Sequence, residues 1–317
     1  MANSAVMSAP KRVEIAITGK CNLTCSYCYY ADEMVARGDL STEKWLNFFD
    51  ELGRMGVMEM TLSGGEVFTR RDIWQLIDSL IVNHMRYSMN TNGTFINEET
   101  IEQWQMGKRR SRLDSVQISM DGSSADIHNA SRPKSFDRTL RGIRLLHQAG
   151  FPLTVRVTIN RHNYKDLRNI ARLLFEDVGV SNFSTNEAYP CGATSRAEDE
   201  VRLTREERNE VMQVLTELNE QYGGRISATA GPLSYAQSFK EIDAALAKGI
   251  TELPGRGKLN ACGGVFTTMA ILHDGSIVPC SAVPTLTMGN IQSDSFTEIW
   301  NTHTIMKQMR ARRDIPL

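Results

Sequence analysis

Three cysteines near the start of the chain carry the strongest chemical signal in the sequence. Cys21, Cys25 and Cys28 stand in the run TGKCNLTCSYC, with C-x3-C-x2-C spacing. Three thiolates on one loop can each bind one iron of a cubane [4Fe–4S] cluster. A cubane has four irons, so one iron would keep an open position, as a reactive metal site requires.

Zinc and buried free thiols are the other interpretations of this cluster. Structural zinc usually has paired cysteine knuckles and four ligands, and here the fourth would have to come from a distant part of the chain. Free thiols gathered this densely would be prone to oxidation. Six cysteines in 317 residues are too few for a disulfide scaffold, which favours a reducing compartment and metal or redox chemistry.

Short β-rich runs alternate with helical patterns through the first two-thirds of the chain. Strands are predicted near 13–18, 58–62, 86–90, 115–120, 153–159 and 182–186, and helices near 42–54, 71–83, 98–107, 135–148, 164–178 and 204–221. Six strand–helix units predict a parallel sheet with right-handed crossovers, either open and doubly wound or a partial barrel. In both cases the reactive surface lies at the C-terminal ends of the strands.

Several residues have the positions of helix ends. Ser41 and Ser135 precede two predicted helices as candidate N-caps, and Thr204 with Glu207 has capping-box spacing. Gly150 follows a helix where a left-handed residue would end it.

The cysteine spacing, with an aromatic residue before the last cysteine, resembles the radical S-adenosylmethionine (SAM) superfamily over most of the chain. The resemblance implies an α/β fold, a partial (β/α)6 TIM-type barrel, which we place over residues 1–225. It also implies a [4Fe–4S] cluster whose open iron is chelated by the amino and carboxylate groups of SAM. Electron transfer from the cluster then cleaves SAM, and the 5′-deoxyadenosyl radical abstracts a hydrogen atom from the substrate.

The resemblance assigns SAM-binding roles to strand ends. The run SGGE at 63–66 looks like the family's motif for the SAM amino group, which implies Gly64, Gly65 and Glu66; the alternative is an ordinary strand-to-helix turn. Ser119 is the residue we expect at the ribose, while Asp121 could simply shape the turn. Thr158, with Asn160, has the right place to face the adenosine.

The segment from His128 to Arg132 resembles the H-D-x-x-R signature of peptide-modifying members, although Asn129 replaces the usual Asp. Arg138 looks like the partner of the SAM carboxylate, with Arg132 as the alternative, because a guanidinium can bind a carboxylate through two parallel bonds. A solvated helix charge is the other interpretation of either arginine.

Two further positions could line the same pocket. Tyr27 could bring its backbone or ring to the adenine, although an aromatic residue is more often part of the packing. Asn90 and Asn92 end the third strand, where they could face SAM, but Asn92-Gly93 is also a turn signal.

The sixth strand is followed by two candidates for catalysis. Cys191 could be a hydrogen-atom donor, a ligand of an auxiliary cluster or a small apolar residue. Glu187 shares the location and could act as a proton acceptor.

Residues 226–317 differ in character and are expected to form a second, smaller unit, with a β-hairpin at 267–279 turning at Asp274-Gly275 and a helix at 295–312. Cys262 and Cys280 have C-x12-G-x4-C spacing, and MGNI and SFTEIWN follow. This resembles the first half of a SPASM domain, which carries auxiliary [4Fe–4S] clusters. The pattern needs five more cysteines, so we expect a SPASM/twitch-like α+β extension that is incomplete at its C-terminus or shortened.

In this family a SPASM-type tail most often accompanies maturation of a ribosomally made precursor peptide. The runs CSYCYYADEM, KRRSRLDSVQISMDGS and SRPKSFDRTLRGIRLL also resemble maturases paired with Nif11-type leader precursors. Some of these are spliceases, which excise a tyramine-derived unit and leave an α-keto-β-amide; crosslinking and epimerisation are alternatives. The implied partners are the precursor peptide, a separate leader-binding protein, and a flavodoxin or ferredoxin reductant.

Other classes of function remain open. One is a radical SAM enzyme that acts on a small molecule in cofactor biosynthesis, and another is a non-enzymatic iron–sulfur or zinc carrier. With 36 basic and 37 acidic residues the net charge is -1, which argues against nucleic acid or a membrane surface as partner. The start, MANSAVMSAPKR, lacks the apolar core of a secretory signal, so a cytoplasmic location is expected.

Overall fold

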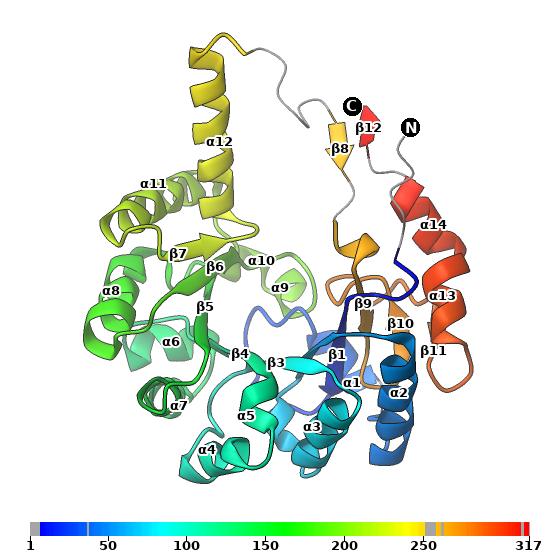
Figure 1. The fold of residues 1–317 in the computed structure, drawn as a ribbon. Coiled ribbons are helices and arrows are strands. Elements are labelled where there is room, and N and C mark those ends of the chain that lie inside the picture. The colour runs from blue at the N-terminus through cyan, green and yellow to red at the C-terminus, as the bar shows by residue number, and fades with distance from the viewer. Residues whose placement is uncertain (1–6, 37, 251–257, 261–262, 312–313, 317) are drawn as a thin grey trace.

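A single curved sheet organises the molecule. The computed structural model describes residues 7–36, 38–250, 258–260, 263–311 and 314–316. Ten strands form this sheet in the order β11-β10-β9-β1-β2-β3-β4-β5-β6-β7. The strands bend into an open arc, and most helices lie along its outer side (Figure 1). The predicted α/β fold with a mostly parallel sheet is confirmed.

The first seven strands are parallel neighbours in chain order. They are β1 (Arg12–Thr18), β2 (Glu59–Gly64), β3 (Arg86–Thr91), β4 (Leu113–Ser119), β5 (Leu153–Ile159), β6 (Phe183–Glu187) and β7 (Ile226–Ala228). Six of them fall at the predicted positions. The short β7 was not predicted and lengthens the sheet by one strand.

The long helices follow their strands as predicted. They are α2 (Thr42–Met55), α3 (Ile73–Val82), α4 (Glu98–Gln105), α7 (Phe136–Gln148), α8 (Leu167–Arg172) continued by η3 (Leu173–Val178), and α11 (Arg205–Gln221). The predicted helix near 164–178 also includes the short η2 (Tyr164–Asp166). The predictions missed other short helical pieces, namely α1 (Ala31–Ala36), α5 (Arg109–Arg112), α6 (Ala125–Ser131), α9 (Ala193–Arg196), α10 (Glu198–Val201), η1 (Val67–Thr69) and η4 (Gly263–Phe266). No helix in the described part of the chain is long and apolar enough to span a bilayer.

The helix-end predictions are mostly confirmed. The Ser41 side chain accepts a hydrogen bond from the Lys44 N–H, Thr204 and Glu207 form a capping box, and Gly150 has a φ of +66°. Ser135 is the exception, because its side chain makes no N-cap bond to α7.

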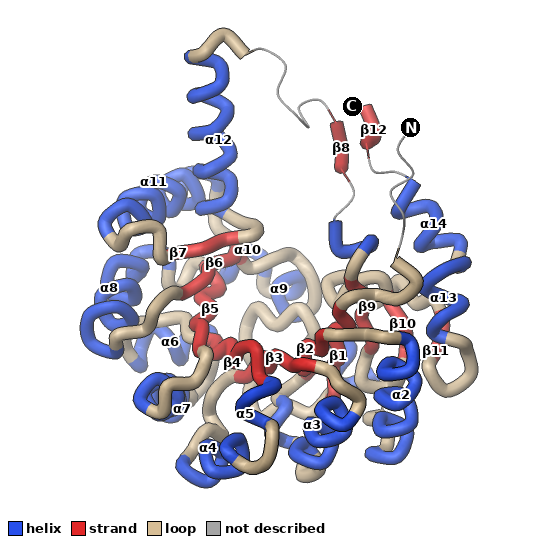
Figure 2. Tube along the Cα trace, viewed as in Figure 1, coloured by secondary structure: helices blue, strands red, loops and turns tan. Residues whose placement is uncertain are grey.

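One long helix was not predicted, α12 (Pro232–Ala247). Its residues lie in a stretch rich in Gly, Ala and Pro, where hydrophobic periodicity is weak. Pro232 stands at the first helical turn, where proline is tolerated because its missing N–H would have no helical partner there. Figure 2 shows α12 beginning beside α11 and extending away from the sheet.

The two faces of the strands differ in polarity. Val13, Ile15 and Ile17 of β1 are 0% exposed and pack on the helical side with Trp45 and Phe49 of α2. The opposite side, which we call the inner face, carries half-buried polar residues on β2 to β6: Thr61, Ser63, Ser88, Asn90, Gln117, Ser119, Thr154, Arg156, Ser184 and Asn186. A closed TIM barrel fills this interior with bulky aliphatic side chains, so this half barrel is built differently.

The tail joins the same sheet. β9 (Thr268–Ile271) pairs parallel with β1, and β10 (Ser276–Val278) and β11 (Gly289–Asn290) follow antiparallel. This confirms the hairpin at Asp274-Gly275.

The predicted helix at 295–312 is broken at His303 into α13 (Phe296–Thr302) and α14 (Thr304–Ala311). β8 (Lys258–Asn260) and β12 (Asp314–Pro316) form a separate pair. The division at residue 225 stays a prediction, since the sheet itself continues on both sides of it.

We expect the tail and the barrel to unfold together. Phe296 of α13 is 0% exposed and meets Phe48 of α2 edge to face, with ring centroids 5.3 Å apart. Phe296→Ala should lower the free energy of unfolding by about 3 kcal/mol in one urea transition. Phe239→Ala, at a side chain that is 56% exposed, is the control and should change it by less than about 0.5 kcal/mol. A separate tail transition, with the main transition unmoved, would contradict this expectation.

Candidate metal and cofactor site

The cysteine loop, residues 19–28, is held in place from three directions. At its start, the Gly19 N–H and the Thr18 hydroxyl both donate to Asp39, at 2.7 and 2.6 Å. In its middle, the Ser26 N–H donates to the carbonyl of Ser131 at 3.0 Å. At its end, the Cys28 carbonyl accepts from the Ala193 N–H at 2.9 Å. Protein contacts therefore hold the loop at its start, its middle and its end.

The three thiols lie close enough together to influence one another. Cys21, Cys25 and Cys28 are all half-buried. Burial, followed by the charges of Cys25 and Cys21, raises the pKa of Cys28 to about 11. Burial also raises the pKa values of Cys21 and Cys25. Three thiolates here need a compensating positive charge, which a metal cluster supplies.

These donors suit a cluster better than a single ion. No three His, Cys, Asp or Glu side chains within the described ranges converge on a position for one metal ion. In a cubane each cysteine binds a different iron, so its ligands need not converge on one point. The soft thiol donors and their grouping on one loop fit a [4Fe–4S] cluster.

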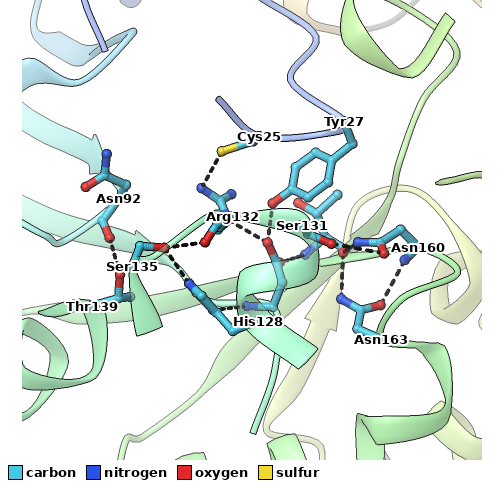
Figure 3. A network of polar contacts seen from close by, with 12 residues as sticks. Cys25, Tyr27, Asn92, His128, Ser131, Arg132, Ser135, Thr139, Asn160 and Asn163 are labelled. Carbon is cyan, nitrogen blue, oxygen red and sulfur yellow. Dashed lines mark hydrogen bonds and ion pairs between the residues drawn. The ribbon is translucent and has the colours of Figure 1, made fainter. Parts of the chain in front are cut away.

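A buried carboxylate connects this loop to the barrel. Asp121 follows β4 and is 0% exposed. It accepts hydrogen bonds from the Tyr27 hydroxyl, from Arg132 Nε at 2.5 Å and from the Thr158 N–H at 2.7 Å. Figure 3 shows two of these partners, Tyr27 and Arg132, close to Cys25 of the cysteine loop. Asp121 thus does more than shape a turn, and Tyr27 uses its hydroxyl within the protein.

Arg132, the alternative candidate for binding the SAM carboxylate, is one of the residues that contact Asp121. Its Nη1 is 3.7 Å from Cys25 Sγ, and its guanidinium lies over the Tyr27 ring at 5.3 Å from the centroid. Among the three thiols, Cys25 therefore has a cation in direct contact. Arg138, the first choice, is placed elsewhere: it is exposed on α7 and donates to the carbonyl of Lys134 at 3.1 Å. The structure brings Arg132, and not Arg138, to the cysteines.

His128 stabilises the segment that carries Arg132. It is 0% exposed; its Nδ1 accepts from the Asp121 N–H at 3.2 Å, and its Nε2 lies 2.9 Å from the Ser135 hydroxyl. Burial, which outweighs the opposing charge of Asp121, lowers the pKa of His128 to about 4. Asn129 accepts from the N–H groups of Ser135 and Phe136, at 2.9 and 3.1 Å, so it caps α7 in place of Ser135.

The Gly64-Gly65 pair packs against the cysteine loop. A Cβ on Gly64, whose φ is +130°, would lie 2.3 Å from the carbonyl oxygen of Thr18, and one on Gly65 would lie 2.2 Å from that of Lys20. The Glu66 carboxylate is 0% exposed and accepts from the N–H groups of Asn92 and Phe68 and from the Thr91 hydroxyl. The glycines allow two backbones to touch, and the buried Glu66 ties the end of β2 to the end of β3.

The remaining predicted cofactor residues lie on neighbouring strands. Asn90 and Ser119 are half-buried on the inner face, near the ends of β3 and β4. Thr158 is 7% exposed, and its hydroxyl donates to Asn186 at 3.2 Å. Their contacts with SAM stay predictions.

The catalytic candidates have different surroundings. Cys191 is half-buried beside Gly192, where a Cβ would lie 2.4 Å from the Cys28 carbonyl oxygen, so the chain at Cys191 lies against the cysteine loop. Glu187 is paired with Arg208 through three contacts of 2.6 to 3.1 Å. This ion pair gives Glu187 a structural role, and proton acceptance stays a prediction.

The tail cysteines are only partly placed. Cys280 is exposed, while Cys262 lies outside the described residues. Tyr29 follows Cys28 in the chain and is 42% exposed overall, yet burial of its hydroxyl raises its pKa, and the charges of Cys28, Glu14 and Cys280 raise it further. The Tyr29 hydroxyl is therefore near both Cys28 and Cys280.

Sequence reasoning missed several residues that hold this site. Asp39, Tyr29 and His273 have no recognisable motif, because each acts through a contact between distant segments. His273 comes from the tail hairpin; its Nδ1 is 2.7 Å from the Tyr30 hydroxyl, and a Cβ on Gly19 would lie 2.8 Å from its Nε2. The tail thus packs against the start of the cysteine loop.

Comparison with known proteins gives consistent matches. The family model of the Radical SAM superfamily matches residues 15–174, and that of SPASM, an iron–sulfur cluster-binding domain, matches residues 262–317. The "AdoMet-dependent heme synthase" of Methanosarcina barkeri is 28% identical, covering 96% of this chain and 86% of that protein. The "Antilisterial bacteriocin subtilosin biosynthesis protein AlbA" of Bacillus subtilis is 26% identical, covering 96% and 62%.

A solved structure shares the fold. Streptococcus suis SuiB bound to the precursor peptide SuiA has a TM-score of 0.74 at 16% identity, covering 96% of this chain and 68% of that one.

A side chain at Gly65 should displace the cysteine loop. We expect Gly65→Ala to reduce iron and sulfide content after anaerobic reconstitution several-fold, because its Cβ would overlap the Lys20 carbonyl. Gly38→Ala is the matched control, since no atom lies within 4 Å of a Cβ there. Equal iron content in both variants would show that the loop tolerates the methyl group.

His128 should make the metal-free protein less stable in acid. An unfolded histidine has a pKa of about 6.5, and the folded value is about 4. Between these values only the unfolded chain binds the proton, so the free energy of unfolding falls as the pH is lowered, by roughly 2 kcal/mol at about pH 5. Urea titrations should show a smaller fall for His128→Asn than for the wild type. Parallel falls would refute the assignment.

Proposed function

The chain belongs to the radical SAM superfamily, and on this premise we propose that it cleaves SAM reductively and removes a hydrogen atom from a ribosomally made precursor peptide. The observation that carries the proposal is the fixed loop with three mutually interacting thiols, placed where the parallel strands end. A [4Fe–4S] cluster and SAM, when bound, supply a carbon radical able to attack an unactivated C–H bond.

The roles of this chain's own residues follow from their positions. Cys21, Cys25 and Cys28 would hold the cluster, and the Arg132 cation beside Cys25 would favour the thiolate there. Thr158, Ser119 and Asn90 would hold SAM along the strand ends. Gly64 and Gly65 would present their turn to its amino group.

Peptide modification is supported by two similarities. AlbA is named as a bacteriocin biosynthesis protein, and SuiB shares the fold and was solved with its precursor peptide. Within this class the finer proposal is splicing at a Tyr-Gly site with loss of a tyramine-derived unit; crosslinking and epimerisation are the alternatives. A leader-binding protein and a flavodoxin or ferredoxin would be partners, and Cys280 with Cys262 would serve an auxiliary cluster in the SPASM region.

A small-molecule substrate is the second candidate. The similarity to the Methanosarcina protein favours this candidate, because that protein is named as a heme synthase and this chain covers 86% of its length. Haem is an iron porphyrin with carboxylate side chains, so its precursors differ from a peptide in shape and charge. Both candidates require the same cluster and the same cleavage of SAM.

Two measurements test this function. Reconstituted protein with SAM and a low-potential reductant should form 5′-deoxyadenosine, and Cys25→Ala should reduce it to background, because the cluster loses a ligand. Cys191→Ala keeps all three loop cysteines and should still form 5′-deoxyadenosine. Wild-type protein that retains zinc and forms none would point to a metal carrier.

Mass spectrometry then separates the reactions. After coexpression with a precursor peptide encoded beside this gene, loss of the tyramine mass indicates splicing, loss of two hydrogens a crosslink, and an unchanged mass with inverted stereochemistry epimerisation. An untouched peptide, together with turnover of a porphyrin precursor of haem, would select the second candidate.

A further inference from the structure

One arginine of the inner face, Arg156, forms no ion pair with any of the described residues. Arg156 stands in the middle of β5, between Val155 and Val157, which are both 0% exposed on the helical side of the sheet. Strand residues alternate between faces, so the Arg156 side chain lies on the inner face. Its Nε is buried and has no hydrogen-bond partner among the described residues.

Two buried arginines of the described chain have acidic partners. Arg132 is paired with Asp121, and Arg109, which is 8% exposed, binds Asp78 through two contacts of 2.7 Å. By contrast, burial lowers the pKa of Arg156, and no acidic neighbour raises it again. The side chain is half-buried, and its buried Nε is a donor without a protein acceptor among the described residues, which is unfavourable unless a bound group supplies the acceptor.

The neighbours of Arg156 along the sheet are neutral. The register places it opposite Ser119 of β4 and Ser184 of β6, and both are half-buried hydroxyl residues. On the same face of β5, Thr158 is already bonded to Asn186. Glu14 of β1, an acidic residue facing the same side, accepts a hydrogen bond from Ser281 at 2.9 Å. These positions make a polar surface with one unpaired positive charge.

This charge lies close to the cysteine-loop contacts. The Arg156 carbonyl accepts a hydrogen bond of 2.9 Å from the N–H of Met120, the residue that precedes Asp121. Two residues further along β5, the Thr158 N–H donates to Asp121, which holds Arg132 against Cys25. A group bound by Arg156 would therefore lie on the inner face below the strand ends.

We propose that Arg156 binds a carboxylate of the substrate, pairing it through the two parallel bonds that a guanidinium offers. The inference rests on the proposed function and names the substrate class as an anion. The carboxylate could be a porphyrin propionate or a carboxylate of the precursor peptide, and the experiment distinguishes these two sources.

The test compares acids with their neutral derivatives. Wild type, Arg156→Gln and Arg156→Lys are reconstituted with the cluster, saturated with SAM and titrated with coproporphyrin III or with its tetramethyl ester, followed by porphyrin absorbance. A second arm uses the C-terminal peptide of the neighbouring precursor as free acid or amide. Arg144→Gln, an exposed arginine of α7, is the control.

In one arm, wild type should bind the acid at least about tenfold more tightly than the neutral derivative. Arg156→Gln should lose this preference, Arg156→Lys should keep part of it, and Arg144→Gln should match wild type. Iron content and SAM affinity should be unchanged in Arg156→Gln. The arm that shows the preference identifies the source of the carboxylate.

Three results would overturn the proposal: no preference for the acid in either arm by wild type, an undiminished preference in Arg156→Gln, or a loss of SAM affinity that assigns Arg156 to the cofactor. Failure of the proposed function is read separately, as absence of 5′-deoxyadenosine from wild type without any substrate.

Discussion

The buried ion pair between Arg132 and Asp121 is the interaction on which the site depends. Three segments meet there: the cysteine loop through Tyr27 and Cys25, the α6 end through Arg132, and β5 through Thr158. Removing either charge would leave the other buried and unpaired, which usually costs several kcal/mol. Such a pair contributes less to net stability than to a unique arrangement, and here the arrangement includes a guanidinium in contact with the Cys25 thiol.

Close backbone contact is the second constraint. Gly64 and Gly65 let the β2 turn touch the start of the cysteine loop, and Gly192 lets the chain after β6 touch its end. Any Cβ at these positions would meet a carbonyl oxygen of the main chain, which cannot rotate away as a side chain can. Both ends of the cysteine loop are therefore in close contact with turns that follow other strands. Cys191 lies in the turn that contacts the end of the loop.

The tail is part of the same construction. Its strands extend the barrel sheet beyond β1, and His273 of its hairpin packs against Gly19. The charges of Cys28 and Cys280 both raise the pKa of Tyr29, after burial of its hydroxyl, so a single side chain is near a cysteine of the loop and a cysteine of the tail. A change in the tail is then expected to reach the loop through direct contacts.

The amino-acid sequence by itself determined the cysteine loop, the order and approximate bounds of six strands and their helices, and the hairpin of the tail. These depend on local spacing, periodicity and turn residues, which a chain carries without reference to distant segments. It favoured Arg138 over Arg132 as the partner of the SAM carboxylate, whereas in the structure Arg132 contacts Cys25 and Arg138 is exposed. The distance of each arginine from the cysteines depends on how α6 and α7 pack against the cysteine loop. The tertiary structure alone made Asp121 a centre of contacts, put Glu187 against Arg208 and left the Nε of Arg156 without an acceptor among the described residues. Those outcomes depend on which strands become neighbours and on how deeply each charge is buried, and neither quantity exists until the chain has folded.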